Sequence, residues 1–242
     1  MINIENVSKS FKDNKVLQDV SFSINTGDFV AIMGPSGSGK STLLYSISGM
    51  DSIDNGKVSF DGINICEMNE KELADFRLSK MGFVFQSPQM LKNLSVLDNI
   101  ILPGLVSKKE SVEEIKKRGL DLMKKMEIEE IQNRDKSQVS GGQLQRASIC
   151  RAMINNPSII FLDEPTGALN SEATDQVLKI LGQLNDEGMT IMTVTHDKRV
   201  AAKARRVIYI IDGRISASKE FTAEIGREIE LDDWLKGLEK PA

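Results

Sequence analysis

The sequence has 242 residues, of which 40% are hydrophobic, and this supports one large domain or two small ones with a buried core. Its 35 Asp and Glu against 31 Lys and Arg give a net charge of −4, so the chain as a whole lacks the positive field that attracts nucleic acid or anionic lipid. Cys66 and Cys150 have no Cys or His neighbour at zinc-ligand spacing, which argues against a zinc site and against a disulfide framework.

No segment is expected to cross a membrane. The longest uninterrupted apolar runs are about the size of residues 207–211, far short of the roughly 18 residues that a membrane span needs. The N-terminus alternates like a strand and lacks the basic-then-apolar pattern of a signal peptide. We therefore expect the chain to work in the cytoplasm.

The first third of the chain predicts two kinds of strand. Apolar and polar residues alternate from Ile2 and again over residues 19–24, which is the pattern of antiparallel strands with one buried face. Residues 29–33, FVAIM, form a continuous apolar run that is typical of a buried parallel strand. A glycine-rich turn and a helical pattern over residues 41–50 follow it, and residues 81–86, MGFVFQ, form another expected strand.

Residues 87–157 contain no convincing strand, so we expect an all-helical insertion there. Ser111 and Glu114 form a capping box at the start of one helix, whose apolar positions recur at helical spacing. The α/β pattern then returns with a buried strand at residues 159–163 and a helix that ends at Gly188.

The C-terminal part continues with an expected strand at residues 189–195 and a hairpin around Asp212 and Gly213. Residues 219–242 are acidic, contain the only tryptophan, Trp234, and show no motif. They could cap the fold, mediate dimerisation or regulate activity.

A phosphate-binding loop follows the first buried strand. Residues 34–41, GPSGSGKS, match the pattern G-x-x-x-x-G-K-[ST] between a strand and a helix, which is the context that the motif requires. The glycines let successive backbone N–H groups point at phosphate, and the helix N-terminus adds positive charge. Lys40 reaches the terminal phosphates, and the hydroxyl of Ser41 can ligate Mg²⁺. By itself this loop leaves kinases, GTPases and ATPases open.

Carboxylates and a histidine stand at the ends of the later strands. Asp163 and Glu164 follow a buried strand at the sheet edge where α/β proteins bind ligands. Adjacent residues of a strand point in opposite directions, so we expect Asp163 to orient Mg²⁺ and Glu164 to face a water that attacks the γ-phosphate. His196, the only histidine, can donate to that phosphate, and Gln86 has the reach to touch Mg²⁺ or the water.

A second cradle for an anion precedes another helix. Ser140-Gly-Gly-Gln143 has small residues at a helix N-terminus, although such a motif in isolation is most often a plain helix cap. One nucleotide hardly needs two cradles from one chain. We therefore expect two copies arranged head to tail, with the loop around Lys40 of one copy and the Ser140–Gln143 motif of the other closing on one ATP.

With these motifs in this order, the chain resembles the ATP-binding subunits of ATP-binding cassette (ABC) transporters from Met1 to about Ser218. The resemblance implies that Phe11 stacks on adenine, that Gln86 is the Q-loop glutamine and that His196 is the switch histidine. It also implies the family's named segments: GPSGSGKS as Walker A, VSGGQ as the signature, IIFLDE as Walker B with its glutamate, and GALN as the D-loop.

Within that family, the runs MGFVFQ, SVLDNIILP and DEPTGALN resemble the MacB/LolD/BceA branch, whose partners are integral-membrane permeases of the FtsX type. This implies a peripheral protein at the cytoplasmic face of the membrane, with a groove near Gln86 that receives a cytoplasmic helix of the permease. The branch handles peptides, lipoproteins and antibiotics and includes antimicrobial peptide resistance, and some members pass signals to a sensor kinase.

The expected fold is α/β, a P-loop NTPase (RecA-like) core with an antiparallel β subdomain and an inserted all-helical signature subdomain. A single ABC ATPase domain would span residues 1–218, with its core at 1–86 and 158–218 and the insertion at about 87–157. Residues 219–242 would form an acidic C-terminal tail of unknown role.

The expected site residues divide by role. Catalysis is assigned to Glu164, His196 and Gln86, and Mg²⁺ binding, partly through water, to Ser41, Gln86 and Asp163. ATP binding is assigned to Phe11, Gly34, Pro35, Ser36, Gly37, Ser38, Gly39, Lys40, Ser41, Thr42, Gln86, Ser140, Gly141, Gly142, Gln143 and Asp163.

The sequence departs from the family pattern in two places. Asn170 stands where the D-loop usually has Asp, and Val139 stands where the signature usually has Leu. Asn keeps the hydrogen-bonding shape of Asp but removes a charge that helps to couple the two sites of a dimer, so we expect turnover or coupling to differ.

Two other classes of protein share part of this pattern. A soluble ABC-type ATPase of DNA repair or chromosome maintenance would need a long coiled coil or a DNA-binding surface, and the insertion is too short and uncharged for either. A small-molecule kinase would use the same phosphate loop without SGGQ and would stay monomeric in ATP.

Overall fold

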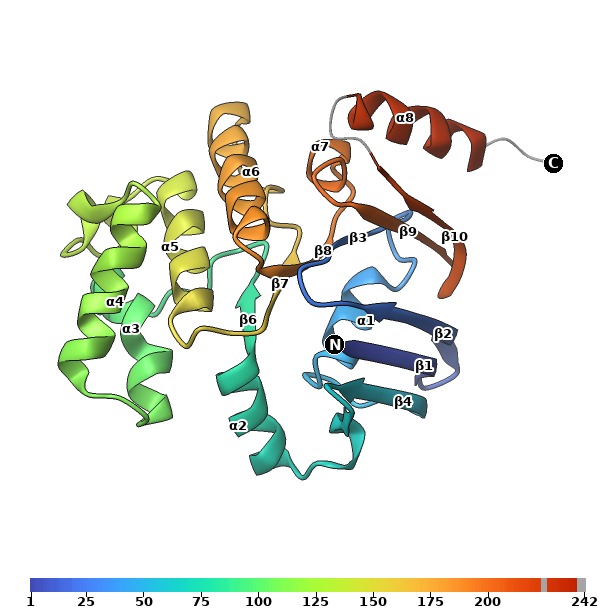
Figure 1. The fold of residues 1–242 in the computed structure, drawn as a ribbon, viewed down its shortest axis with the longest axis horizontal. Helices are drawn as coiled ribbons and strands as arrows, with labels where there is room; N and C mark the ends of the chain where they lie inside the picture. The colour runs from blue at the N-terminus through green and yellow to red at the C-terminus, as the bar shows by residue number, and fades with distance from the viewer. Residues whose placement is uncertain (223–225, 239–242) are drawn as a thin grey trace.

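The computed structural model describes residues 1–222 and 226–238, and two sheets form its framework (Figure 1). The antiparallel sheet has the strand order β2-β1-β4-β5. Its strands are β1 (Ile2–Phe11), β2 (Asn14–Ile24), β4 (Asn55–Phe60) and β5 (Ile63–Asn64). The expected antiparallel β region at the N-terminus is confirmed, although the sequence did not single out β4 as a strand.

The larger sheet has six strands in the order β10-β9-β3-β8-β7-β6. Five of them run parallel, and β10 closes the edge as the second strand of the expected hairpin. The strands are β3 (Phe29–Met33), β6 (Met81–Val84), β7 (Ile159–Asp163), β8 (Thr190–Val194), β9 (Arg206–Ile211) and β10 (Arg214–Glu220). Because β3, β7 and β8 lie side by side, their carboxyl ends meet at one edge.

Helices occupy the connections. They are α1 (Lys40–Ile47), α2 (Glu70–Lys80), α3 (Val96–Ser107), α4 (Val112–Lys125), α5 (Gly141–Met153), α6 (Ser171–Asp186), α7 (Lys198–Ala201) and α8 (Arg227–Leu238), with short 3₁₀ turns at Ile65–Glu67, Glu129–Ile131 and Lys136–Gln138. None of these described helices is long and apolar enough to cross a membrane.

The central strands of the six-stranded sheet are buried on both faces, and alternate residues of one strand supply two different cores. In β3, Ala31 and Met33 join the core that includes α3, α5, α6 and α8, whereas Val30 and Ile32 join the core beneath α1 and the antiparallel sheet. This explains why β3, β7 and β8 have no exposed position and consist mostly of apolar residues.

Helices α3, α4 and α5 form a group at one end of the molecule, on the left of Figure 1. All residues from 85 to 158 are described, and none of them lies in a strand. Ser111 and Glu114 form the predicted capping box of α4. Gly119 lets α4 approach α3 closely, since a Cβ there would lie 2.6 Å from Cγ2 of Ile101.

The C-terminal residues, which the sequence left without a structural assignment, include α8. Leu231 and Leu235 of this helix are buried in the core. The ring of Trp234 lies edge-on to Tyr209 of β9, with 6.4 Å between the ring centroids. This helix is therefore packed against the sheet by a regular apolar face.

Candidate functional site

The phosphate loop leaves β3 at Met33 and enters α1 at Lys40. A Cβ at Gly34 would lie 2.1 Å from the carbonyl oxygen of Ile210, and one at Gly39 would lie 2.7 Å from that of Val16. Both glycines also have positive φ angles, of 152° and 97°. Only glycine fits at these two positions, so the loop is pressed between β9 and β2.

Lys40 folds back into this loop. Its Nζ donates to the carbonyl oxygens of Gly34 (3.0 Å) and Pro35 (2.8 Å). Burial lowers the pKa of Lys40, and the nearby carboxylates of Glu164 and Asp163 oppose that shift. An ammonium group thus sits beside the N-terminus of α1, where unpaired backbone N–H groups favour an anion.

Asp163 ends β7 with its carboxylate almost fully buried, at 8% exposure. Oδ1 accepts a hydrogen bond from Ser41 Oγ at 2.9 Å, and Oδ2 accepts one from the hydroxyl of Tyr45 at 2.6 Å. Burial, together with this hydrogen bond to Asp163, raises the pKa of Tyr45 to about 12. Both oxygens of the carboxylate are therefore held by α1.

Tyr45 was not among the site residues expected from the sequence. It lies four residues after Ser41 on α1, so both side chains share one face of the helix, and that spacing is the signal that could have identified it. The hydroxyl of Ser41 and the carboxylate of Asp163 are oxygen donors, which fit Mg²⁺ because this ion takes few protein ligands and completes its shell with phosphate and water.

Glu164 turns to a different set of partners. Its φ angle is 47°, and its backbone N–H donates to the carbonyl of Val194 at 2.9 Å, so the chain bends sharply after β7. Oε1 lies 2.9 Å from Nδ1 of His196, and Oε2 accepts hydrogen bonds of 3.3 Å from Thr195 Oγ1 and from the backbone N–H of His196. The glutamate is mostly buried, whereas the histidine side chain is 69% exposed.

Gln86 and Phe11 are two exposed members of the expected ATP site. Gln86 follows β6 and is exposed, and its Nε2 would lie 3.1 Å from a Cβ placed at Gly167, three residues after Glu164. Phe11 ends β1 and is 50% exposed, so its ring is not core packing. The buried ammonium of Lys9 lies 5.1 Å from the centroid of that ring.

The Ser140–Gln143 motif is elsewhere in the chain. It begins α5 as a capping box, in which Ser140 Oγ accepts from the N–H of Gln143 (3.2 Å) and Gln143 Oε1 accepts from the N–H of Ser140 (3.0 Å). Ser140 and Gly141 are exposed. Figure 1 shows α5 in the helical group, apart from α1 and its loop. One chain therefore does not bring its two anion cradles together.

Asn170 begins α6 as its N-cap, and its Oδ1 accepts from the N–H of Ala173 at 2.9 Å. The start of α6 lies against the Ser140–Gln143 motif, since a Cβ at Gly142 would lie 2.8 Å from Cβ of Ala173. Asn170 thus retains the capping bond that an aspartate would make and lacks only the charge.

Comparison with known proteins identifies the family. The sequence profile of the ABC transporter family matches residues 17–167. The chain is 41% identical to the ABC transporter ATP-binding protein MJ0796 of Methanocaldococcus jannaschii, over 91% of this chain and 97% of that protein. It is 39% identical to the lipoprotein-releasing system ATP-binding protein LolD of Leptospira interrogans, over 92% of this chain and 93% of LolD.

A longer relative and a solved structure extend the comparison. The chain is 42% identical to the macrolide export ATP-binding/permease protein MacB of Mannheimia succiniciproducens over 89% of its own length, but it spans only 34% of MacB. A dimeric structure of MJ0796 in a post-hydrolysis state, bound to ADP and Pi, superposes with a TM-score of 0.86 at 39% identity and covers 92% of this chain and 100% of that one. The predicted fold of a P-loop ATPase cassette is thereby confirmed.

The phenol of Tyr45 predicts a pH dependence of stability. Its folded-state pKa of about 12 lies above the ordinary value of 10.0, so between these values the folded chain keeps a proton that the unfolded chain has lost. The stabilisation is complete below pH 10 and is lost as the pH rises towards 12. Denaturant unfolding at a series of pH values in this window should show this loss in the wild type and in Tyr209→Phe, but not in Tyr45→Phe. Equal slopes in all three proteins would contradict the assignment.

Proposed function

This chain belongs to the ABC transporter family and is an ATP-binding, ATP-hydrolysing subunit, and we propose that it drives an FtsX-type permease by closing around ATP as a head-to-tail dimer. The observation that carries the proposal is the division of the site. The phosphate loop and the carboxylates share one sheet edge, whereas the exposed Ser140–Gln143 cap lies apart from them in the same chain. A second copy supplies the missing cradle.

The opening and closing of this dimer is the proposed output. Lys40 and the N–H groups of α1 hold the phosphates from one copy, and the backbone at Gly141 and Gly142 of the other copy closes on the γ-phosphate. Hydrolysis removes the contacts to the γ-phosphate, so the two copies separate. Adenine stacks on the exposed ring of Phe11.

Glu164 is the proposed general base. Its carboxylate is mostly buried beside Lys40 and is oriented by Thr195 and the backbone of His196, which keeps it fixed near the phosphate edge. When Nδ1–H of His196 donates to Glu164, Nε2 of a neutral ring carries no proton. His196 can therefore donate to the γ-phosphate only after leaving Glu164 or as a cation, and its exposure permits the movement.

Mg²⁺ belongs to this proposal as the ATP counter-ion. Ser41 and Asp163 would hold it, with Gln86 as a further ligand partly through water, and the bound ion would neutralise charge that develops on the phosphates. Tyr45 fixes the second oxygen of Asp163, so the first oxygen keeps its direction towards Ser41.

An apolar groove of about 400 Å³ is the proposed permease site. The rings of Phe83 and Phe85 stack along its wall with 6.3 Å between their centroids, and Ala74 of α2 and Ala152 of α5 line it. Such a groove suits one apolar face of a helix. Gln86 directly follows Phe85 in the chain, so the backbone that lines the groove continues into the glutamine assigned to the ATP site.

We propose the membrane surface as the site of action, with the permease as the anchor. LolD is the ATP-binding protein of a lipoprotein-releasing system and MacB is a macrolide export ATP-binding/permease protein. These two relatives support lipoproteins or antibiotics as the class of cargo, and the resemblance to their branch extends the proposal to peptides, including antimicrobial peptides. We also propose the domain division expected from the sequence, a single ABC ATPase domain over residues 1–218 with its core at 1–86 and 158–218 and the helical insertion at about 87–157, followed by an acidic C-terminal tail at 219–242.

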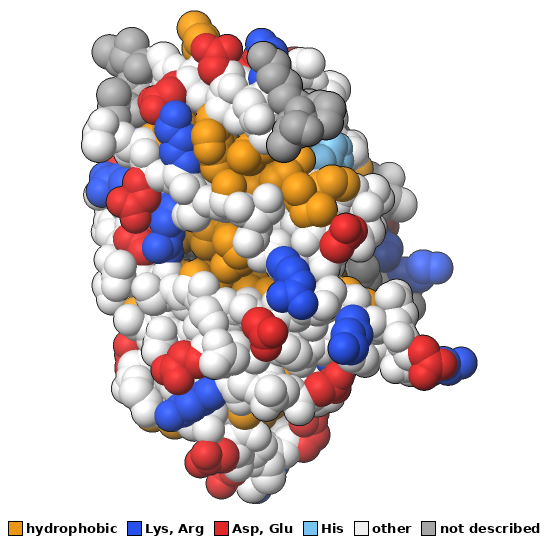
Figure 2. All heavy atoms as spheres, turned by 90° about the vertical axis from the view of Figure 1, so that its right-hand side faces the viewer, with side chains coloured by type: hydrophobic (Ala, Val, Ile, Leu, Met, Phe, Trp, Pro, Cys, Tyr) orange, Lys and Arg blue, Asp and Glu red, His pale blue; other side chains and the backbone are white. Residues whose placement is uncertain are grey.

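A DNA-repair ATPase is not favoured. The relatives are transporter subunits. On the face of the molecule seen in Figure 2, basic and acidic side chains are interspersed around an apolar area, whereas a DNA-binding surface needs clustered Lys and Arg.

Glu164→Gln should bind ATP but lose turnover by more than about 100-fold, because the amide cannot accept the proton of the attacking water. A dimer that needs ATP should then accumulate and be visible by size-exclusion chromatography with light scattering. Glu113→Gln, an exposed position on α4, is the control and should behave as wild type. Wild-type turnover in Glu164→Gln would overturn the role of Glu164.

Affinity purification of the tagged chain from its own cells in mild detergent should recover a multi-spanning permease with a large extracytoplasmic domain. Ala74→Arg places a charged side chain in the groove, so recovery should fall by about ten-fold while the ATPase activity of the purified subunit stays unchanged. Asp75→Arg, the next residue on α2, lies outside that groove and is the control. Recovery of DNA or coiled-coil proteins without a membrane partner would refute the transporter proposal.

A further inference from the structure

Helix α7 is a single turn that directly follows His196 and Asp197. A helix of four residues has too few internal hydrogen bonds to be stable by itself, so its position depends on what holds it. The segment from His196 to Ala204 is therefore fixed by its neighbours.

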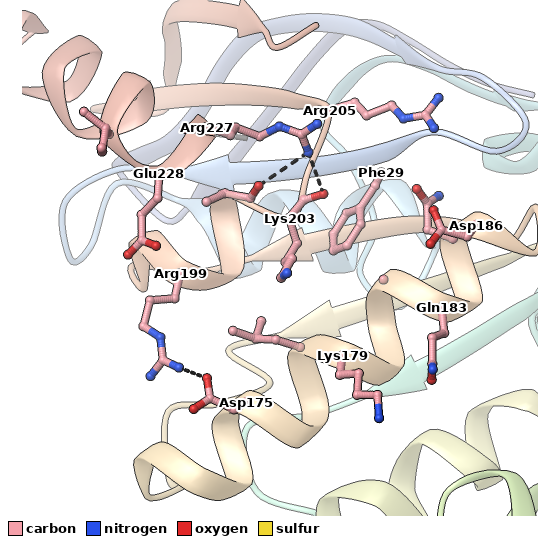
Figure 3. A pocket seen from close by; sticks show the side chains of 16 residues that line it. Phe29, Asp175, Lys179, Gln183, Asp186, Arg199, Lys203, Arg205, Arg227 and Glu228 are labelled. Atoms are coloured by element: carbon pink, nitrogen blue, oxygen red, sulfur yellow. Dashed lines mark hydrogen bonds and ion pairs between the residues drawn. The ribbon is translucent and has the colours of Figure 1, made fainter. Parts of the chain in front are cut away.

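The start of α7 is tied towards α6. Asp197 caps the helix by accepting from the N–H of Arg199 at 2.8 Å, and its other oxygen accepts from the hydroxyl of the buried Thr166 at 3.2 Å. Arg199 forms an ion pair with Asp175 of α6, seen at the lower left of Figure 3. These contacts link the histidine segment to the loop that follows Glu164.

The turn that directly follows α7, residues 202–204, is held by Arg227, the first residue of α8. The Arg227 side chain is buried, with a residue exposure of 6%, and its Nη1 lies within hydrogen-bond distance of three carbonyl oxygens, those of Ala202 (3.4 Å), Lys203 (3.2 Å) and Ala204 (3.2 Å). Figure 3 shows this guanidinium reaching across from α8. Buried carbonyl oxygens need hydrogen-bond donors, and a guanidinium supplies several from one side chain.

A second link joins the two helices at the surface. Lys198, the first residue of α7, forms an ion pair with Asp232 of α8. Asp232 also pairs with Lys236 of its own helix at 2.5 Å. Both of these pairs are partly exposed, so each contributes little compared with the buried contacts of Arg227.

Helix α8 is itself anchored independently of α7. Leu231 and Leu235 are buried, and Trp234 packs on Tyr209 of β9. Tyr209 pairs with Met33 of β3, and the carbonyl of the next residue, Ile210, lies against Gly34 of the phosphate loop. The support for α7 thus rests on the strand that also packs against the phosphate loop.

We propose that α8 is the support that holds α7, and through it His196, at the phosphate edge, with Arg227 as the positioning residue. The inference rests on the proposed role of His196 in turnover. Loss of the Arg227 contacts frees the segment from His196 to Ala204 while the phosphate loop and Lys40 stay in place. The effect falls on kcat and leaves the affinity for ATP almost unchanged.

Arg227→Met keeps the length of the side chain and removes its hydrogen bonds. Its kcat should fall between about 10-fold and 100-fold, with KM for ATP within about two-fold of wild type, because misplacing a distant catalytic group costs this much. Hydrogen exchange measured by mass spectrometry should rise over residues 196–204 and not over β3 or β7. Arg227→Lys should restore most of both properties.

Lys236→Met is the matched control, because it removes a pair inside α8 and leaves every link to α7. It should show wild-type kcat and exchange. If Arg227→Met does not fold, Asp232→Asn tests the second link, and it should raise exchange over residues 196–204 and lower kcat in the same direction by a smaller factor.

His196→Ala separates failure of this inference from failure of the proposed function. If His196→Ala loses turnover but Arg227→Met keeps wild-type kcat, or shows no rise in exchange over residues 196–204, the inference is wrong and the proposed function stands. If His196→Ala turns over ATP normally, the proposed role of His196 fails and the inference fails with it.

Discussion

The carboxylate of Asp163 is the charge around which the nucleotide edge is arranged. It ends a strand that is buried on both faces, and a carboxylate in such a place is stable only when its oxygens accept hydrogen bonds. Ser41 and Tyr45 donate both bonds from α1, so α1 must begin beside β7 and the loop before it must turn within six residues. Gly34, pressed against Ile210, permits that turn. The phosphate cradle and the carboxylate therefore depend on each other.

The sequence predicts those parts of the fold whose pattern depends on burial. The strands expected at 29–33, 159–163 and 189–195 are confirmed as β3, β7 and β8, and every residue of these strands is buried because both faces of the sheet are covered there. Helix α2 was missed since none of its residues is buried, and only the capping box of Asn69 with Glu72 marks its start. The apolar residues of α8 can be seen in the sequence. The residues that they pack against, such as Tyr209, come together only in the tertiary fold, so the sequence did not predict where this helix lies.

The site divides in the same way. Strand ends place Asp163, Glu164 and His196 at one edge, so their proximity follows from the order of the strands. The role of Ser140 does not follow from the order of the elements, because in one chain its hydroxyl and its backbone N–H already form the hydrogen bonds of a helix cap. A cap and an anion cradle use the same N–H groups, and the choice between them depends on what approaches from outside. Asn170 behaves in the same way. Within one chain it makes the helix-capping hydrogen bond that an aspartate would make.

The contacts of α7 show how a segment at the surface can influence the position of a site residue, His196. This single helical turn is held on two sides, by Thr166 and Asp175 at its start and by Arg227 at the turn that follows it. Buried, charge-assisted hydrogen bonds outweigh exposed ion pairs, so Arg227 sets the position more firmly than the salt bridge of Lys198 with Asp232 does. Helix α8 rests on β9, and β9 lies against the phosphate loop, so packed atoms connect the C-terminal helix to that loop without a break. The C-terminal helix α8 thus helps to position His196 relative to the phosphate loop.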